Sequence, residues 1–579
     1  MKLLWIAPAA AALNAAPSYA QDPLAPLQAA PQPQAPPMQP TQAPPIFQLP
    51  APAPVIIVPR DWPGVFAAIR RGDWPAARAG IATLPPGTLT AVAKAELYTA
   101  RNSPVVSLPE MQALLAEAPD LPQAEQIARM TVTRGAITPP LIVARRPVIG
   151  LGAAPGRYRT KAVSGEPLAD SLRKQLEPLV DANDAVGAEY LVYSQMPMLS
   201  FEARAEAWQR VAWIYYVTGQ DAHARRVADA GRLGATGEWS AAAAWVSGLA
   251  SWRLNDCNAA AFSFRHVIAT TGQRELRSGA YYWAARAEQA CRRPQSVAPL
   301  LRAAAQSQES FYGLVARETL GTETRIAKTT PVSTASVDSL PNVRRAAELA
   351  NIGERPLAEQ LLRHQARVGS PAHQPALVAV AARLDLAGTQ YWLATNGQRG
   401  ARVDTSDRYP MPNWVPVRGW RVEPALAFAH AIQESNFQSN AVSPIGATGL
   451  LQVRPGTASD MARAAGLPYS PSSLFDPRYN LEFGQSFIER LRSSSATGAQ
   501  LPRVIAAYNA GPVPVARWAS IQDRGDPLLW MESIPYWETR YYVPAVMRNL
   551  WVYEGLASRP QASLSALAQH RWPPFPTAR

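Results

Sequence analysis

Glu434 is the carboxylate that the sequence places in the most unusual setting. Apolar residues precede it at the spacing of one helix face: Ala425, Phe428, Ala429 and Ile432. Asn436 and the polar residues after it predict that this helix ends there, with Glu434 in its last turn. Apolar neighbours and the partial negative charge of a helix C-terminus both raise the pKa of a carboxyl group. Most helical glutamates are simply solvated, but one that stays protonated near neutral pH can act as a general acid.

The segment after this helix predicts a loop that folds back over the helix end. Residues 443–449 read Ser-Pro-Ile-Gly-Ala-Thr-Gly, which contains too many turn formers to continue a helix. The two glycines allow a close approach of the backbone to another group. Further on, Thr457 and Asp460 have the spacing of a capping box, which predicts a structural role for Asp460 at the start of the next helix.

This region resembles the catalytic domain of the soluble lytic murein transglycosylases. Four blocks carry the resemblance in the family's order: Glu434-Ser435, then Ser443 with residues 446–452 and 455–458, then residues 507–512, and finally residues 532–543. A single Glu-Ser pair is uninformative, whereas four ordered blocks are a specific signal. The resemblance implies a small, mainly α-helical, lysozyme-like domain over residues 396–558, followed by a C-terminal tail at 559–579.

The resemblance also implies a reaction and its residues. The family cleaves the β-1,4 bond between N-acetylmuramic acid and N-acetylglucosamine in peptidoglycan and forms a 1,6-anhydromuramic acid end. Glu434 would act first as the acid and then as the base, without a metal or cofactor. Ser443 would position the substrate acetamido group. The remaining expected substrate-binding residues are Gln452, Tyr508, Asn509 and Glu538, although Asn509 could steady its loop and Glu538 could be an exposed cap residue.

Two other functions stay open at this stage. A hydrolytic muramidase would use the same acid, but it normally needs a second carboxylate across the scissile bond, and the sequence identifies none for that role. A non-catalytic peptidoglycan-binding scaffold in the periplasm would make Glu434 dispensable. The sequence favours the lytic transglycosylase over both, because Glu434, Ser443, Gln452 and Tyr508 are all present.

The N-terminal sixty residues predict export. Residues 1–20 have a lysine, a mostly apolar stretch and a Ser-Tyr-Ala ending, which is typical of a secretory signal peptide. Residues 21–60 are rich in Pro, Ala and Gln and predict an extended linker. No later segment has the length and apolarity of a membrane span. We therefore expect a protein located in the periplasm, with peptidoglycan glycan strands as its polymeric partner.

Residues 61–395 predict an all-α region built as a solenoid. The sequence of this region is rich in alanine and has helical spacing, interrupted by Gly, Pro or Asn-Asp. It is similar to tetratricopeptide-like helix pairs. Such a solenoid offers a concave surface that could also bind periplasmic proteins. Residues 310–314 and 320–321 resemble the Phe-Tyr-Gly and Leu-Gly block that closes the corresponding region of the family.

The chain has two cysteines, Cys257 and Cys291. An even number in an exported protein favours a disulfide. Aligning Trp252 with Arg286, however, places both cysteines at one position of a 34-residue repeat. Equivalent positions of stacked repeats are commonly about 10 Å apart, beyond the roughly 7 Å between Cα atoms that a disulfide spans. The sequence leaves both states open.

Composition adds a positive net charge of +13. This charge favours an acidic polymer, and the free carboxylates of peptidoglycan stem peptides fit it. Nucleic acid is disfavoured, because the sequence has no recognised nucleic-acid-binding motif and begins with an export signal. A metal site is disfavoured too, since the six histidines form no ligand spacing with either cysteine.

Overall fold

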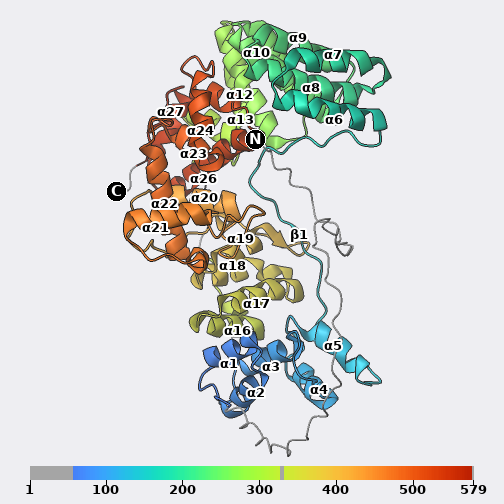
Figure 1. Cartoon of the computed structure of the whole chain (residues 1–579), viewed down its shortest axis with the longest axis vertical. Helices are drawn as coiled ribbons and strands as arrows, with labels where there is room; N and C mark the ends of the chain where they lie inside the picture. Colours follow the sequence, from blue (N-terminus) through green and yellow to red (C-terminus); the bar gives the residue numbers. More distant parts are fainter. Residues whose placement is uncertain (1–55, 327–330, 577–579) are drawn as a thin grey trace, which may run out of the picture. The chain divides into compact units, whose positions relative to one another are not determined.

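The computed structural model describes residues 56–326 and 331–576. The regular secondary structure of this part of the chain is almost entirely α-helical, which confirms the predicted fold class (Figure 1). Its one sheet pairs β1 (Ile149–Gly150) with β2 (Asn396–Gly397) in antiparallel register. The predicted signal peptide and residues 21–55 of the predicted linker lie outside the described residues. None of the described helices is long and apolar enough to cross a membrane.

The interval predicted as one solenoid contains three runs of helices, and an extended segment separates the first run from the second. The first run comprises α1 (Trp62–Arg71), α2 (Trp74–Thr83), α3 (Thr90–Thr99), α4 (Leu108–Glu117) and α5 (Ala124–Thr133). Residues 134–166 then contain no helix, because prolines at positions 139, 140, 147 and 155 remove backbone donors and restrict φ. Figure 1 shows this segment as a long stretch without helix between α5 and α6, with β1 within it.

The second run is a continuous stack in which each helix packs against its neighbours in sequence. It comprises α6 (Pro167–Asp181), α7 (Ala185–Gln195), α8 (Phe201–Val217), α9 (Asp221–Gly231), α10 (Gly237–Arg253), α11 (Cys257–Thr270), α12 (Arg274–Ala290), α13 (Pro294–Ala305) and α14 (Phe311–Thr319). A short 3₁₀ turn, Met196–Met198, separates α7 from α8. The sequence predicts a solenoid over residues 61–395, and this stack covers residues 167–319 of that interval.

The helices after this stack return to the first run. They are α15 (Ala335–Asp338), α16 (Pro341–Asn351), α17 (Arg355–Val368), α18 (Gln374–Arg383) and α19 (Ala387–Thr395). Their buried side chains form one hydrophobic cluster with those of α1–α5. The side chains of α6–α14 instead share a cluster with the C-terminal helices. Sequence order and packing order therefore differ in this part of the chain.

Local sequence explains how the solenoid helices pair. Asn255 takes a left-handed conformation (φ 61°), and Asp256 then caps α11 by accepting from the backbone N–H of Ala259. Asn183 and Asp184 repeat this arrangement before α7. Small residues let the helices approach closely: a Cβ added at Gly248 of α10 would lie 2.6 Å from the ring of Phe264 on α11.

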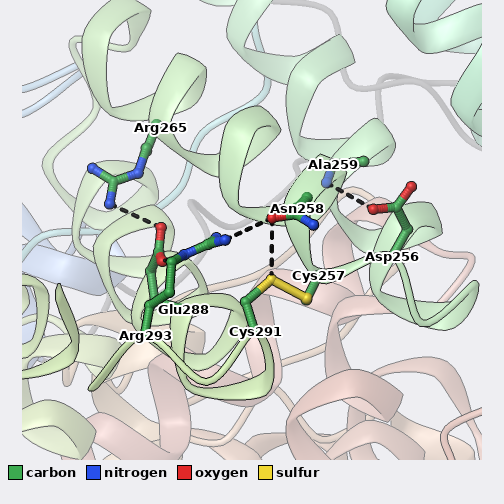
Figure 2. Close-up of a disulfide and its surroundings, with 8 residues drawn as sticks. All are labelled: Asp256, Cys257, Asn258, Ala259, Arg265, Glu288, Cys291 and Arg293. Atoms are coloured by element: carbon green, nitrogen blue, oxygen red, sulfur yellow. Dashed lines mark hydrogen bonds and ion pairs between the residues drawn. A yellow bond between two sulfur atoms is a disulfide. The ribbon is translucent and has the colours of Figure 1, made fainter. Parts of the chain in front are cut away.

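Cys257 and Cys291 form a disulfide with a Cα–Cα distance of 5.5 Å (Figure 2). The repeat alignment that argued against it is wrong by about one helical turn. Cys257 is the first residue of α11, and the first residue of the next equivalent helix, α13, is Pro294. Cys291 lies before that position, directly after α12, so the bond joins the start of one helix to the end of the following one. Arg293 also reaches across and donates to Asn258 Oδ1 at 2.6 Å.

The C-terminal helices form the predicted α-helical domain. They are α20 (Pro424–Ser435), α21 (Pro455–Ala465), α22 (Pro477–Arg492), α23 (Leu501–Ala510), α24 (Pro512–Arg517), α25 (Pro527–Glu532), α26 (Trp537–Leu556) and α27 (Ala562–Ala568). The other 3₁₀ turns of the described chain are Pro371–His373, Thr405–Arg408, Pro471–Phe475 and Trp518–Ser520. The long helix α26 packs against α20 and α23 at the centre of the domain.

Two details of this domain differ from simple expectation. The predicted capping box at Thr457 and Asp460 is wrong, because α21 already begins at Pro455 and Arg454 is its N-cap residue. Asp460 lies within the helix and forms an exposed ion pair with Arg463. The segment predicted as a tail contains α27, which packs against α14 of the solenoid.

Candidate active site

Glu434 lies in the last turn of α20, as predicted. The helix ends at Ser435, and Asn436 takes a left-handed conformation (φ 50°) that turns the chain away. Nearly all of α20 is buried, from Ala425 to Ile432. This burial fixes the position of the helix, and Glu434 is half-buried at its end beside a cavity.

The pKa of Glu434 is raised from 4.5 to about 7. Burial is the main cause, since it disfavours the charged carboxylate. A hydrogen bond from Tyr542 lowers the pKa, and the negative charge of Glu538 raises it. A carboxyl group with this pKa holds its proton near neutral pH and can give it to a leaving group.

Two buried side chains orient the Glu434 carboxyl group. The Tyr542 hydroxyl donates to Glu434 Oε1 at 2.5 Å, and His430 Nδ1 lies 2.7 Å from the same hydroxyl. Burial lowers the pKa of His430 to about 3, so its ring is neutral. Because the tyrosine proton is directed at Glu434, the hydrogen between His430 and Tyr542 must be the Nδ1–H of the imidazole. The chain of donors therefore runs from His430 through Tyr542 to Glu434.

The loop that follows α20 folds back over the end of the helix, as predicted. Ser435 donates from Oγ to the carbonyl of Leu450 at 2.7 Å, which holds the returning strand of the loop. Ser443 Oγ accepts from the backbone N–H of Ala447 at 2.9 Å. Gln452, with a left-handed φ of 47°, donates its side-chain amide to the carbonyl of Gly449 at 2.8 Å.

Gly449 is required by both conformation and space. Its φ is 78°, and an added Cβ would lie 2.2 Å from the side-chain amide nitrogen of Asn480 and from the carbonyl oxygen of Leu474. Asn480 itself is fully buried, donates to the carbonyl of Thr448 at 2.9 Å and accepts from the N–H of Leu451 at 2.8 Å. The Asn480 side chain thus holds the loop through two hydrogen bonds.

The cavity beside Glu434 has a volume of about 500 Å³. Of the residues predicted from the sequence, the structure brings five to its wall: Glu434, Ser443, Gln452, Asn509 and Glu538. Asn509 Oδ1 accepts from the Thr539 hydroxyl at 2.6 Å, so this asparagine ties α23 to α26 as well as lining the cavity.

Tyr508 is placed differently from the expectation that it binds sugar. It does not line the cavity, and its hydroxyl donates to the carbonyl of Leu451 at 2.7 Å. Its ring packs against His430, with 4.6 Å between ring centroids, and against Phe487. In this structure Tyr508 supports the loop and the helix that carry the site.

Several residues of the site were not found from the sequence. Tyr542 lies in a recognised block, but only its contact with Glu434 distinguishes it from the adjacent Tyr541. His430 lies among the buried residues of α20, and nothing in the sequence distinguishes it from them as a site residue. Arg157, Arg408 and Arg548 also line the cavity and come from three distant parts of the chain. Among the described residues, no group of three or more His, Cys, Asp or Glu side chains is arranged to hold a metal ion.

Comparisons with known proteins find similar sequences over the segment that contains Glu434. Residues 417–530 match the transglycosylase SLT domain family. The soluble lytic murein transglycosylase of Escherichia coli K12 is 36% identical over 132 residues, which is 22% of this chain and 20% of that protein. A putative soluble lytic murein transglycosylase of Haemophilus influenzae is 34% identical over 146 residues, or 25% and 24% of the two chains. The matched segments thus span about a fifth to a quarter of these curated relatives.

Solved structures are similar over most of the chain. The 70 kDa soluble lytic transglycosylase of Escherichia coli aligns with a TM-score of 0.53 at 16% identity, covering 88% of this chain and 98% of that one. An inactive mutant of the lytic transglycosylase Slt of Pseudomonas aeruginosa aligns with a TM-score of 0.51 at 19% identity, covering 86% of each chain. These likenesses concern the fold. Residues 417–530 therefore belong to the transglycosylase SLT domain family, and the chain has the fold of the soluble lytic transglycosylases.

Proposed function

We propose that this protein is a lytic transglycosylase that cleaves the β-1,4 bond between N-acetylmuramic acid and N-acetylglucosamine in peptidoglycan. One observation carries the proposal: a half-buried glutamate with a pKa raised to about 7 lines a cavity within an SLT domain. The relatives named above are lytic murein transglycosylases. Four of the other five predicted site residues, Ser443, Gln452, Asn509 and Glu538, line the same cavity as Glu434.

Glu434 performs both proton transfers in this proposal. As the acid, it protonates the glycosidic oxygen, and the bond from that oxygen to C1 of the muramic acid breaks while the substrate acetamido group stabilises the cationic centre. Glu434, now ionised, takes the proton of the C6 hydroxyl, whose oxygen bonds to C1 and forms the 1,6-anhydro ring. Tyr542 and His430 hold the carboxyl group in place. No water is consumed, and Glu434 ends protonated for the next cycle.

The cavity wall supplies the substrate contacts. Ser443 positions the acetamido group, Gln452 and Asn509 hydrogen-bond sugar substituents, and Glu538 binds at the rim. The amide nitrogen of Gln452 is donated to the loop, so its oxygen is the atom available to a sugar hydroxyl or N–H. Tyr508 acts indirectly, through the carbonyl of Leu451.

The location in this proposal is the periplasm, where the polymer is found. The disulfide between Cys257 and Cys291 is a bond that persists in oxidising compartments. The stack of helices α6–α14 provides a surface on which periplasmic proteins can dock. The net charge of +13 favours a polymer that carries carboxylates.

A hydrolytic muramidase is the second candidate, because the structure places another carboxylate in the cavity. Glu538 is exposed, lines the cavity wall and acts on Glu434 strongly enough to raise its pKa. A muramidase would use such a group to activate water or to attack C1. In the transglycosylase, Glu538 only raises the pKa of Glu434 and binds the substrate.

The test is mass spectrometry of the fragments that the mature protein releases from purified peptidoglycan. Products about 18 Da lighter than the hydrated muropeptides, formed by the wild type and absent with Glu434→Gln, support the transglycosylase. Hydrated reducing ends that require both Glu434 and Glu538 support the muramidase. Release of nothing by the wild type, together with equal binding of glycan by wild type and Glu434→Gln, indicates a non-catalytic scaffold.

A further inference from the structure

Helix α7 of the solenoid has two apolar faces, and within the described chain only one of them is covered. The buried face belongs to the hydrophobic cluster of the stack and consists of Ala185, Ala188 and Val192. Val186, Tyr190 and Tyr193 follow one another at i, i+4 and i+7 on a different face, and each is between 68% and 78% exposed. A helix that is apolar on two sides is normally buried on both.

Two more exposed apolar side chains follow directly after α7 in the chain. Met198 ends the 3₁₀ turn behind the helix and Phe201 is the first residue of α8, and they are 67% and 55% exposed. Arg204 stacks its guanidinium group over the Phe201 ring, 5.2 Å from the centroid. Tyrosine, phenylalanine, methionine and arginine are the residue types enriched in protein–protein interfaces. We call Val186, Tyr190, Tyr193, Met198 and Phe201 the α7 surface.

The α7 surface has the area that a weak protein dimer needs. A fully covered aromatic side chain buries about 150–250 Å², so these five partly exposed side chains offer roughly 600 Å² on one copy. Two copies would bury about 1,200 Å² together, which is the lower end of the range for specific interfaces. Such an interface implies a dissociation constant on the order of micromolar.

The apolar stripe of α7 is nearly symmetric along the helix. Val186 lies four residues before Tyr190, and Tyr193 lies three residues after it. If a second copy of α7 packs antiparallel, with a two-fold axis beside Tyr190, Val186 of each copy lies opposite Tyr193 of the other. The stripe is therefore complementary to itself, as an interface with two-fold symmetry requires.

The charges at the two ends of α7 favour the same antiparallel arrangement. Asp181 and Asp184 are exposed at the start of the helix. At its other end Arg204 donates to two backbone carbonyls, and the nearby carboxylates of Glu166 and Glu202 accept hydrogen bonds from a hydroxyl and a backbone N–H of the same chain. An antiparallel copy places the two aspartates opposite the arginine, whereas a parallel copy places like charges together.

We infer that the α7 surface is an interface between two copies of this chain, which pack their α7 helices antiparallel about a two-fold axis near Tyr190. The inference does not depend on the proposed function, because Glu434 takes no part in the contact. A lipid surface fits less well, since Asp181 and Asp184 would face the headgroups of anionic lipids. A glycan strand stacked on the tyrosines would leave Met198 and Phe201 uncovered.

The experiment is sedimentation velocity of the full chain at concentrations from about 1 to about 100 µM. We expect monomers at the lowest concentration and dimers at the highest. Tyr190→Asp places two like charges at the two-fold axis and should weaken the dimer at least about tenfold. Tyr158→Asp is the matched control, because Tyr158 is 60% exposed and lies outside the α7 surface, and it should leave the association unchanged. Equal Tm values show that each variant is folded.

Charge reversal tests the antiparallel arrangement itself. Arg204→Asp and Asp181→Arg should each weaken the dimer, and the double variant should recover most of the wild-type affinity, since each copy then offers the reversed pair. A protein that stays monomeric at the highest concentration, a dimer that tolerates Tyr190→Asp, or losses that add in the double variant overturn the inference. Monomers whose binding to phospholipid vesicles or to glycan oligosaccharides is lost with Tyr190→Asp also overturn it, and assign the surface to that ligand.

Discussion

The hydroxyl of Tyr542 donates to Oε1 of Glu434 at 2.5 Å, across 108 residues of sequence. This bond leaves Oε2 of Glu434 to carry the acid proton toward the cavity. It also lowers a pKa that burial and Glu538 raise. The pKa of Glu434 on α20 thus depends on burial and on two residues of α26 with opposing effects, Tyr542 and Glu538.

Removing the Tyr542 hydroxyl should change the pH dependence of activity. In Tyr542→Phe the stabilising hydrogen bond to the carboxylate is lost, so the pKa of Glu434 rises. The decline of kcat/KM on the alkaline side, expected near pH 7 for the wild type, should move to higher pH. We expect kcat itself to fall about tenfold, because the carboxyl group is no longer oriented. Anhydro-muropeptide release measured from pH 5 to 9 checks both effects.

Tyr469→Phe is the matched control for this variant. The Tyr469 hydroxyl is buried in the same domain and makes no hydrogen bond in the described chain. Its removal should leave the pH profile in place. An unchanged profile in Tyr542→Phe as well would show that the hydroxyl does not act on the acid.

Glu538→Gln should shift the alkaline decline of kcat/KM in the opposite direction, to lower pH. Removing a negative charge near Glu434 lowers the pKa of that carboxyl, so kcat/KM should begin to fall at a lower pH than in the wild type. At pH values below this decline, kcat/KM should stay within about tenfold of the wild-type value, because Glu538 transfers no proton in the proposed reaction. A loss as complete as that of Glu434→Gln would make Glu538 a second catalytic carboxylate.

Glu434→Gln should stabilise the protein at alkaline pH. The pKa of Glu434 is about 7 in the folded state against 4.5 in the reference state, so the folded state holds its proton more tightly. The associated stability is complete below about pH 4.5 and is lost as the pH rises through 7. Glutamine avoids this loss, and with partial exposure taken into account the gain is about 1–2 kcal/mol. Calorimetric Tm values of the two proteins should coincide near pH 4 and diverge by pH 8.5.

Loss of the disulfide should weaken the solenoid and leave the site chemistry intact. Cys257 and Cys291 close a loop of 34 residues, for which chain entropy gives about 3–4 kcal/mol. The double variant Cys257→Ser, Cys291→Ser should have a lower Tm than the wild type. A reductant should lower the Tm of the wild type and leave the Tm of the variant unchanged. A Tm that is insensitive to reductant would contradict this assignment.

The sequence predicted the local parts of the site because they lie in one contiguous stretch. The apolar face of α20, its end at Asn436 and the return of the loop all follow from spacing and turn formers within a few residues. The raised pKa of Glu434 follows from burial, which that spacing also indicates. The direction of this pKa shift could therefore be predicted from the sequence.

The remaining parts depend on contacts that sequence spacing does not encode. Tyr542 and Arg548 reach the cavity because α26 packs on α20, and Tyr508 turns to the carbonyl of Leu451 because the loop passes above it. The capping box at Asp460 failed because Pro455, a favourable first helical residue, starts α21 earlier. The disulfide was undecided because a repeat length misjudged by a few residues changes which helix ends meet.

The extended segment between α5 and α6 limits how far this protein can be treated as modular. Arg157, from that segment, donates two hydrogen bonds to the buried carboxylate of Glu532, and Gly156 and Ala153 line the cavity. A fragment that begins after the solenoid would bury Glu532 without its guanidinium partner and would lack one cavity wall. Transferring the C-terminal helices of this chain to another protein would therefore require this distant segment as well.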